Sequence, residues 1–103
     1  MDIRKFQKEI IEHKKKQGFN YTDINLEFLC LYGEVGEAYD AYSKKKPGLG
    51  GELADIAIYL CALSEMLGFD LEKEIKDKME INKKRKYKMV DGVLLREKTD
   101  IDP

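Results

Sequence analysis

The sequence has 103 residues, the length of one domain, and 38% of them are charged although the formal net charge is only −1. Such a close balance of positive and negative charge argues against a dedicated binder of nucleic acid or of membrane surfaces, because such proteins carry a strong basic excess. The longest apolar stretch, Ile56–Leu63, is too short to span a bilayer, and Asp2–Lys5 lacks the apolar core of a secretory signal. We therefore expect one domain over residues 1–103, in a soluble cytoplasmic protein.

The first predicted element is a helix from about Asp2 to Gln17. Ile3, Phe6 and Ile10 recur at helical spacing on one face, and lysines fill the opposite face. The segment Gly18–Asn20 breaks the pattern and ends this helix.

The second predicted helix has Thr22 or Asp23 as its N-cap and continues to about Lys45. Pro47–Gly51 marks a loop, since it combines proline with three glycines. A third helix follows this loop and reaches Leu67.

Gly68, with Phe69 behind it, predicts a left-handed cap that closes the third helix. The fourth helix extends from a cap at Asp70 to about Tyr87, with its apolar positions facing inward, namely Leu71, Ile75 and Met79. Beyond it, Met89–Leu94 resembles a small hairpin around Asp-Gly, and a loose tail over residues 88–103 is the alternative.

The second and third helices are apolar on nearly every face. Such helices belong at the centre of a bundle or against another subunit. Short connections favour an all-α, four-helix up-and-down bundle, which a homodimer or homotetramer would complete. Cys30 and Cys61 lie within these apolar runs, which is typical of buried reduced thiols; a disulfide or a ligand role is the alternative.

Four carboxylates interrupt this apolar background, namely Glu34, Glu37, Glu52 and Asp55. Each pair is spaced three residues apart, so each pair projects from one face of a helix. Buried carboxylates are costly unless a cation compensates them, and hard oxygen ligands suit Mg²⁺ or Mn²⁺. The alternative is that these are ordinary surface acids, because E-x-x-E is frequent in helices. Gly33 and Gly36 flank Glu34 and favour close approach of a helix or a ligand.

A basic stripe on the fourth helix consists of Lys78, Asn82 and Arg85, which share one helix face. Two cations and an amide suit the oxygens of a polyphosphate. A solvated basic helix end is the alternative, since cations near a helix C-terminus also favour the helix dipole.

In their order along the chain, these motifs resemble the signature of the MazG-like, all-α nucleoside triphosphate pyrophosphohydrolases. That signature has E-x-x-E, matched by Glu34 and Glu37, then E-x-x-D, matched by Glu52 and Asp55. K-x-x-x-N-x-x-R follows and is matched by Lys78, Asn82 and Arg85. The resemblance covers roughly residues 3–87.

The resemblance implies an oligomeric helical enzyme that hydrolyses the α–β phosphoanhydride of a nucleoside triphosphate, giving a monophosphate and pyrophosphate, with nucleotide-pool sanitation as its role. By the same resemblance the four carboxylates are catalytic and hold Mg²⁺, while Lys78, Asn82 and Arg85 meet the phosphates or the sugar. The base pocket is not part of the signature, and position alone suggests Phe6, Gln7 and Phe28. Some relatives stack the base on tryptophan, which this chain lacks.

Three rival interpretations exist. The chain is alternatively a specialised relative acting on dUTP or on phosphoribosyl-ATP, or a non-catalytic helical interaction module. The third rival is a ferritin-like di-metal bundle, which needs Glu-x-x-His motifs. The single histidine, His13, lies in a lysine-rich stretch that we expect to face solvent, which disfavours such a bundle.

Overall fold

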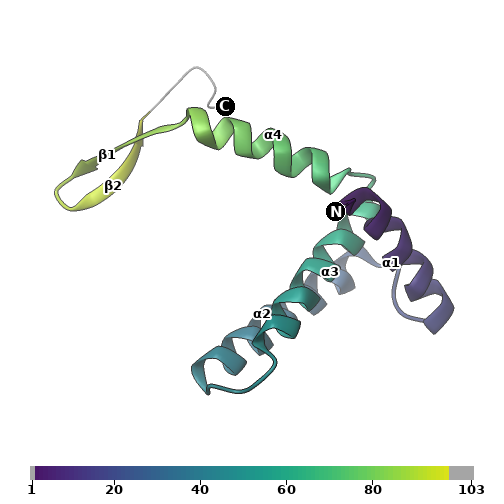
Figure 1. The fold of residues 1–103 in the computed structure, drawn as a ribbon. Helices are drawn as coiled ribbons and strands as arrows, with labels where there is room; N and C mark the ends of the chain where they lie inside the picture. Colours follow the sequence, from purple (N-terminus) through teal and green to yellow (C-terminus); the bar gives the residue numbers. More distant parts are fainter. Residues whose placement is uncertain (1, 98–103) are drawn as a thin grey trace. The chain divides into compact units, whose positions relative to one another are not determined.

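The computed structural model describes residues 2–97, in which four helices precede two short strands (Figure 1). The elements are α1 (Ile3–Gln17), α2 (Ile24–Ser43), α3 (Leu49–Leu67), α4 (Leu71–Lys84), β1 (Lys86–Val90) and β2 (Val93–Glu97). The predicted all-α class and the short C-terminal hairpin are therefore confirmed. The chain divides after Leu71 into two compact units, and each is described by itself.

In the first unit α2 and α3 form an antiparallel pair, and α1 packs against α3 (Figure 1). The apolar side chains buried in this unit are mostly small: Ala38 and Ala41 of α2, and Ala62 and Leu63 of α3. Small side chains at a contact allow two helices to approach closely. This close pairing of α2 with α3 positions the candidate site.

Aspartates begin the first two helices. The Asp2 carboxylate accepts a hydrogen bond from the Lys5 amide at 3.0 Å, and the Asp23 carboxylate accepts one from the Leu26 amide at 3.0 Å. Each bond satisfies a backbone N–H that the first helical turn leaves without a partner. Of the two predicted caps of α2, the structure thus selects Asp23.

The end of α3 has the predicted left-handed cap. Gly68 adopts φ 82°, a conformation that side chains with a Cβ rarely adopt, and the Phe69 amide donates to the Ser64 carbonyl at 2.8 Å. The side chain of Gln7, on α1, is hydrogen-bonded to the turn after α3. Its amide N–H donates to the Phe69 backbone carbonyl at 2.8 Å, and its carbonyl oxygen accepts from the Leu71 backbone amide at 2.9 Å. Gln7 is fully buried. It therefore has a structural role, and the suggestion that it recognises a base is wrong.

Two predicted boundaries are corrected. The central loop is shorter than expected, because α3 begins at Leu49 and includes Gly50 and Gly51 in its first turn. The fourth helix ends at Lys84 and not near Tyr87, because Tyr87 belongs to β1. Cross-strand pairing thus overrides the helical spacing from Lys86 onward.

The hairpin pairs β1 with β2 in antiparallel register, from Lys86 opposite Glu97 to Val90 opposite Val93. Asp91 at φ 49° and Gly92 at φ 79° form the two-residue turn, and positive φ at both positions matches a type I′ turn. Of the two predictions for this segment, hairpin or loose tail, the hairpin is observed. The last part of the predicted tail, residues 98–103, lies outside the described residues.

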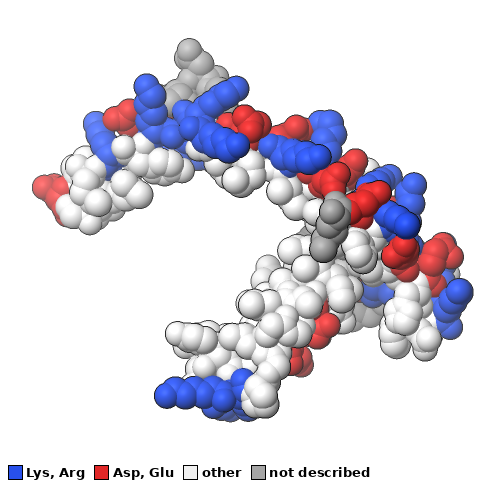
Figure 2. All heavy atoms as spheres, viewed as in Figure 1, with Lys and Arg blue, Asp and Glu red and all other residues white. Residues whose placement is uncertain are grey.

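Many large apolar side chains are exposed. Tyr32, Tyr39 and Leu29 of α2 are 74%, 69% and 66% exposed, and Ile75 and Met79 of α4, which we expected to face inward, are also exposed. Figure 2 shows a broad uncharged surface over α2 and α3, whereas basic side chains, with acidic ones among them, lie along α4 and β1. Within residues 2–97, no helix combines the length and the apolarity needed to cross a membrane.

Candidate functional site

The acidic site forms where α2 and α3 pair. A five-residue connection, residues 44–48, reverses the chain between the two helices, so the second half of α2 lies against the first half of α3. Carboxylate oxygens of Glu34, Glu37 and Glu52 all lie within 4.8 Å of one another. The structure therefore brings three of the four predicted metal ligands together.

Asp55, the fourth predicted ligand, lies outside this group of three but within its electrostatic range. Its charge acts on Glu34, as do the charges of Glu37 and Glu52. Asp55 is exposed on α3, one helical turn after Glu52. We refer to Glu34, Glu37, Glu52 and Asp55 together as the acidic cluster.

The acidic cluster differs from several other acids of the chain in its partners. Asp40 pairs with Lys44 and Lys46 at 2.7 and 2.6 Å, and Asp77 pairs with Lys73 at 2.6 Å. In the described part of the chain, no lysine or arginine pairs with any member of the cluster. Among the described residues, no lysine or arginine therefore compensates the negative charges of the cluster.

Two oxygens of the cluster are buried without compensation. Glu34 Oε2 and Glu52 Oε2 are shielded from solvent and have no hydrogen-bond partner among the described residues. Burial raises the pKa of the Glu34 carboxyl above its usual 4.5, and the charges of Glu37, Asp55 and Glu52 raise it further. The site thus resists carrying its full negative charge unless a cation is present.

The cluster fits a hard divalent cation. Oxygen ligands lie about 2.0–2.6 Å from Mg²⁺ or Ca²⁺, so two ligands of one ion are separated by at most about 4–5 Å. The three clustered oxygens, within 4.8 Å of one another, satisfy the limit of about 5 Å for Ca²⁺ and would have to move closer to reach the limit of about 4 Å for Mg²⁺. Their chemistry, carboxylates alone, suits Mg²⁺ or Mn²⁺ more than a soft transition metal.

Tyr59 of α3 connects the acidic cluster to an adjacent pocket. Its hydroxyl lies within electrostatic range of the Cys30 thiol on α2 and of the carboxylates of Glu34 and Glu27. Burial raises the pKa of the Tyr59 hydroxyl above its usual 10.0, with smaller contributions in the same direction from Cys30 and the two glutamates. Both cysteines are free, as predicted, but they are half-buried and not buried as we expected.

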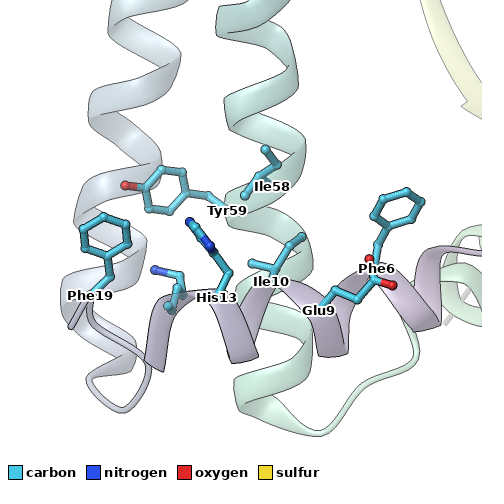
Figure 3. Close-up of a pocket in the computed structure, with 8 residues that line it drawn as sticks. Phe6, Glu9, Ile10, His13, Phe19, Ile58 and Tyr59 are labelled. Carbon is cyan, nitrogen blue, oxygen red and sulfur yellow. The ribbon is translucent and has the colours of Figure 1, made fainter. Parts of the chain in front are cut away.

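The adjacent pocket has a cavity volume of about 350 Å³. Figure 3 shows side chains of α1 and α3, together with Phe19, around it. His13 meets the Phe19 ring edge to face, with the centroids 6.1 Å apart. The lining residues are Phe6, Glu9, Ile10, His13, Lys14, Phe19, Ile58 and Tyr59. We call this the aromatic pocket; it includes Phe6, one of the residues suggested for the base, and not Phe28.

A buried ion pair lies beside the aromatic pocket. Lys14 is 8% exposed and Glu27 is 1% exposed, and Lys14 Nζ lies 2.8 Å from Glu27 Oε2. The Asn20 amide donates to Glu27 Oε1 at 3.2 Å, and the Lys14 ammonium lies 5.3 Å from the centre of the Tyr59 ring. Because Glu27 precedes Glu34 by seven residues, about two helical turns, both lie on the same face of α2.

The predicted phosphate-binding residues lie in the second unit. Lys78 and Asn82 belong to α4, and Arg85 is one residue past its end. Arg85 Nη1 donates to Asn82 Oδ1 at 3.0 Å, so these two side chains are adjacent as the spacing predicts.

Sequence reasoning missed most of the aromatic pocket and the buried ion pair. Ile10, His13 and Lys14 come from α1, Phe19 from the connection, and Tyr59 from α3. A pattern within one helix cannot reveal such a combination. The only available signal was the seven-residue spacing of Glu27 and Glu34.

Comparisons with known proteins identify two similar proteins. Over 98 aligned residues the chain is 33% identical to dCTP pyrophosphatase 1 from Homo sapiens and 31% identical to dCTP pyrophosphatase 1 from Rattus norvegicus. Each alignment covers 82% of this chain and 56% of the relative. The chain therefore spans little more than half the length of these curated relatives. No family model and no solved structure matches it.

Proposed function

We propose that the protein is a nucleotide pyrophosphatase that depends on a divalent cation. It hydrolyses a nucleoside or deoxynucleoside triphosphate between the α and β phosphates, giving a monophosphate and pyrophosphate. The observation that carries the proposal is the convergence of Glu34, Glu37 and Glu52 within 4.8 Å, without a lysine or arginine partner among the described residues. The similarity to dCTP pyrophosphatases and the order of the MazG-like motifs support it, and that resemblance alone motivates the position of the cut.

In this proposal the acidic cluster holds Mg²⁺, or Mn²⁺, through the carboxylates of Glu34, Glu37, Glu52 and Asp55. A bound cation supplies charge that polarises the phosphoryl oxygens and lowers the pKa of a bound water. A cluster carboxylate with a free oxygen accepts the proton of the attacking water. All four residues are therefore assigned a catalytic role.

The aromatic pocket is proposed to take the nucleobase. Phe6 and Phe19 offer apolar ring faces for a planar base, in a chain without tryptophan. Tyr59 lines this pocket and lies within electrostatic range of Glu34, which supports a pocket near the acidic cluster. A base bound there would therefore leave its phosphates close to the carboxylates.

The remaining assignments follow from the resemblance and from exposure. Lys78, Asn82 and Arg85 are proposed to contact the phosphates or the sugar, since an arginine fork binds two oxygens and a lysine supplies a point charge. Lys44 and Lys46, already paired with Asp40, are not assigned to the substrate.

The exposed apolar residues of α2 and α3 are proposed to be covered in a homodimer or homotetramer.

The test is a product analysis with purified protein, Mg²⁺ and a panel of triphosphates that includes dCTP, dUTP and phosphoribosyl-ATP. We expect pyrophosphate and a monophosphate from at least one substrate, and no turnover in excess EDTA. Orthophosphate with a diphosphate would show a different reaction. Turnover of no member of the panel would favour a non-catalytic helical module.

A further inference from the structure

Lys14 is unusual among the lysines of residues 2–97 because it is buried. Removing an ion pair from water often costs more free energy than the attraction between the two charges supplies. An apolar pair of similar volume is frequently as stable. Lys14 and Glu27 nevertheless pair at 2.8 Å beside a pocket that is otherwise largely apolar. Stability alone therefore gives a weak reason for a cation at this position.

The ammonium of Lys14 retains capacity for a ligand. It has three N–H donors and no acceptor. Within residues 2–97 its partners are the Glu27 carboxylate and the face of the Tyr59 ring. Because Lys14 also lines the aromatic pocket, a ligand there can offer it an acceptor oxygen but gains nothing by offering an amino group.

Glu27 fixes the position of this donor. Its carboxylate is held from the other side by the Asn20 amide, which also donates to the Asp23 carbonyl at 2.8 Å. Asn20 and Glu27 thereby tie Lys14 of α1 to the start of α2. A charged donor held in this way distinguishes an acceptor from a donor on the ligand edge more sharply than a mobile surface lysine does.

We propose that Lys14, positioned by Glu27, is a specificity-determining residue of the aromatic pocket and selects planar rings that carry a carbonyl oxygen. The inference rests on the proposed function, under which the ring is a nucleobase. Uracil, thymine, cytosine, guanine and hypoxanthine carry a ring carbonyl, whereas adenine carries none. Adenine nucleotides are therefore the poorest ligands of this pocket.

The first experiment uses the unaltered protein and needs no variant. Calorimetry measures the binding of non-hydrolysable α,β-methylene deoxynucleoside triphosphates of adenine, hypoxanthine, uracil and cytosine in the presence of Mg²⁺. Hypoxanthine and adenine differ at C6 by a carbonyl in place of an amino group. We expect hypoxanthine to bind roughly 10- to 100-fold more tightly than adenine, the usual effect of one charged hydrogen bond. Adenine binding as tightly as every other base would overturn the inference.

The second experiment removes the pair as a unit. The variant Lys14→Met/Glu27→Leu replaces both charges by apolar groups, so neither is left buried alone. Lys16→Met, an exposed lysine of the same helix, is the matched control. We expect the double variant to lose roughly 10-fold or more in affinity for the carbonyl-bearing analogues, with little change for adenine, and the control to match the unaltered protein. Thermal unfolding verifies that both variants are folded.

These outcomes separate the inference from the proposed function. Turnover with unchanged base preference in a folded double variant overturns the role of Lys14 and leaves the pyrophosphatase intact. Analogue binding with the expected preference, but without turnover of the true triphosphates, supports the role of Lys14 and removes the catalytic proposal. Binding of none of the analogues overturns both.

Discussion

Glu37 is the exposed member of the three clustered carboxylates, so changing it to glutamine alters the charge of the site without opening a cavity. If the cluster holds the catalytic cation, Glu37→Gln should lower kcat by about 100-fold or more, because such ions contribute several kcal/mol to the transition state. Steady-state rates at saturating Mg²⁺ measure this effect. Glu74→Gln, an exposed glutamate of α4, is the matched control, and an equal loss in both variants would contradict a specific role.

Glu34 allows a prediction about pH, since its pKa is raised mainly by burial and then by three neighbouring carboxylates. Between the usual value of 4.5 and the raised value, the folded protein binds more protons at this site than the unfolded chain does. The ionised carboxylate therefore destabilises the cation-free fold above that interval, and the penalty disappears as the pH falls to 4.5.

Accordingly, Glu34→Gln should melt at a higher temperature than the unaltered protein at pH 7–8 in EDTA, by roughly 4 °C or more per kcal/mol of relief. The difference should shrink toward pH 4.5 and reverse in sign with Mg²⁺, which stabilises only the protein with all four ligands. Thermal unfolding under the three conditions checks this. An unchanged melting temperature in EDTA would show that Glu34 experiences no repulsion.

At the scale of elements, α2 brings Glu34 and Glu37 close to Glu52 of α3, whereas several of its aromatic residues are exposed. Glu34 lies in the helix pair, whereas Tyr32 and Tyr39 are largely exposed. Sequence spacing predicted correctly that Glu34 and Glu37 share a face. It could not say which way that face points, because the helix is apolar on nearly every side and both orientations bury apolar surface.

The end of α4 illustrates a second limit of sequence reasoning. Lys78, Asn82 and Arg85 follow a helical repeat, and the predicted helix therefore continued to Tyr87. The Asp91-Gly92 turn instead pairs residues 86–90 with residues 93–97. A turn that closes a hairpin acts on residues several positions away, which a local helical repeat does not reveal.

The stripe at the end of α4 is tested by Asn82→Ala and Arg85→Ala. If these side chains bind phosphate oxygens, each variant should lose roughly 10-fold or more in kcat/KM while its affinity for Mg²⁺ stays the same. A rise in KM alone would indicate equal contacts in the ground and transition states, and a fall in kcat would indicate contacts that tighten during reaction. Lys83→Ala, whose lysine pairs with Glu80 at 3.1 Å, is the control. Unchanged kinetics in both test variants would identify the stripe as a solvated helix end.

At the scale of the whole molecule, the exposed apolar surface of α2 and α3 predicts self-association. Light scattering at micromolar concentration should give at least twice the 12.0 kDa of one chain. Tyr32→Lys should shift the protein toward the monomer, because a charge at the core of an interface is desolvated without a partner. Lys8→Glu on α1 changes charge outside this surface and serves as the control. A monomeric unaltered protein would contradict the prediction.

The location of Tyr59 has a thermodynamic consequence. One phenol both lines the aromatic pocket and interacts with Glu34, so a change at either place alters its surroundings at the other. If the aromatic pocket binds a base and the acidic cluster binds a cation, the two are linked equilibria, and each ligand must change the affinity for the other by the same factor. Titrating Mg²⁺ with and without a saturating deoxynucleoside, which has no phosphate to bind the ion directly, measures that factor. Tyr59→Phe, which keeps the ring and removes the hydroxyl, should bring the factor closer to one.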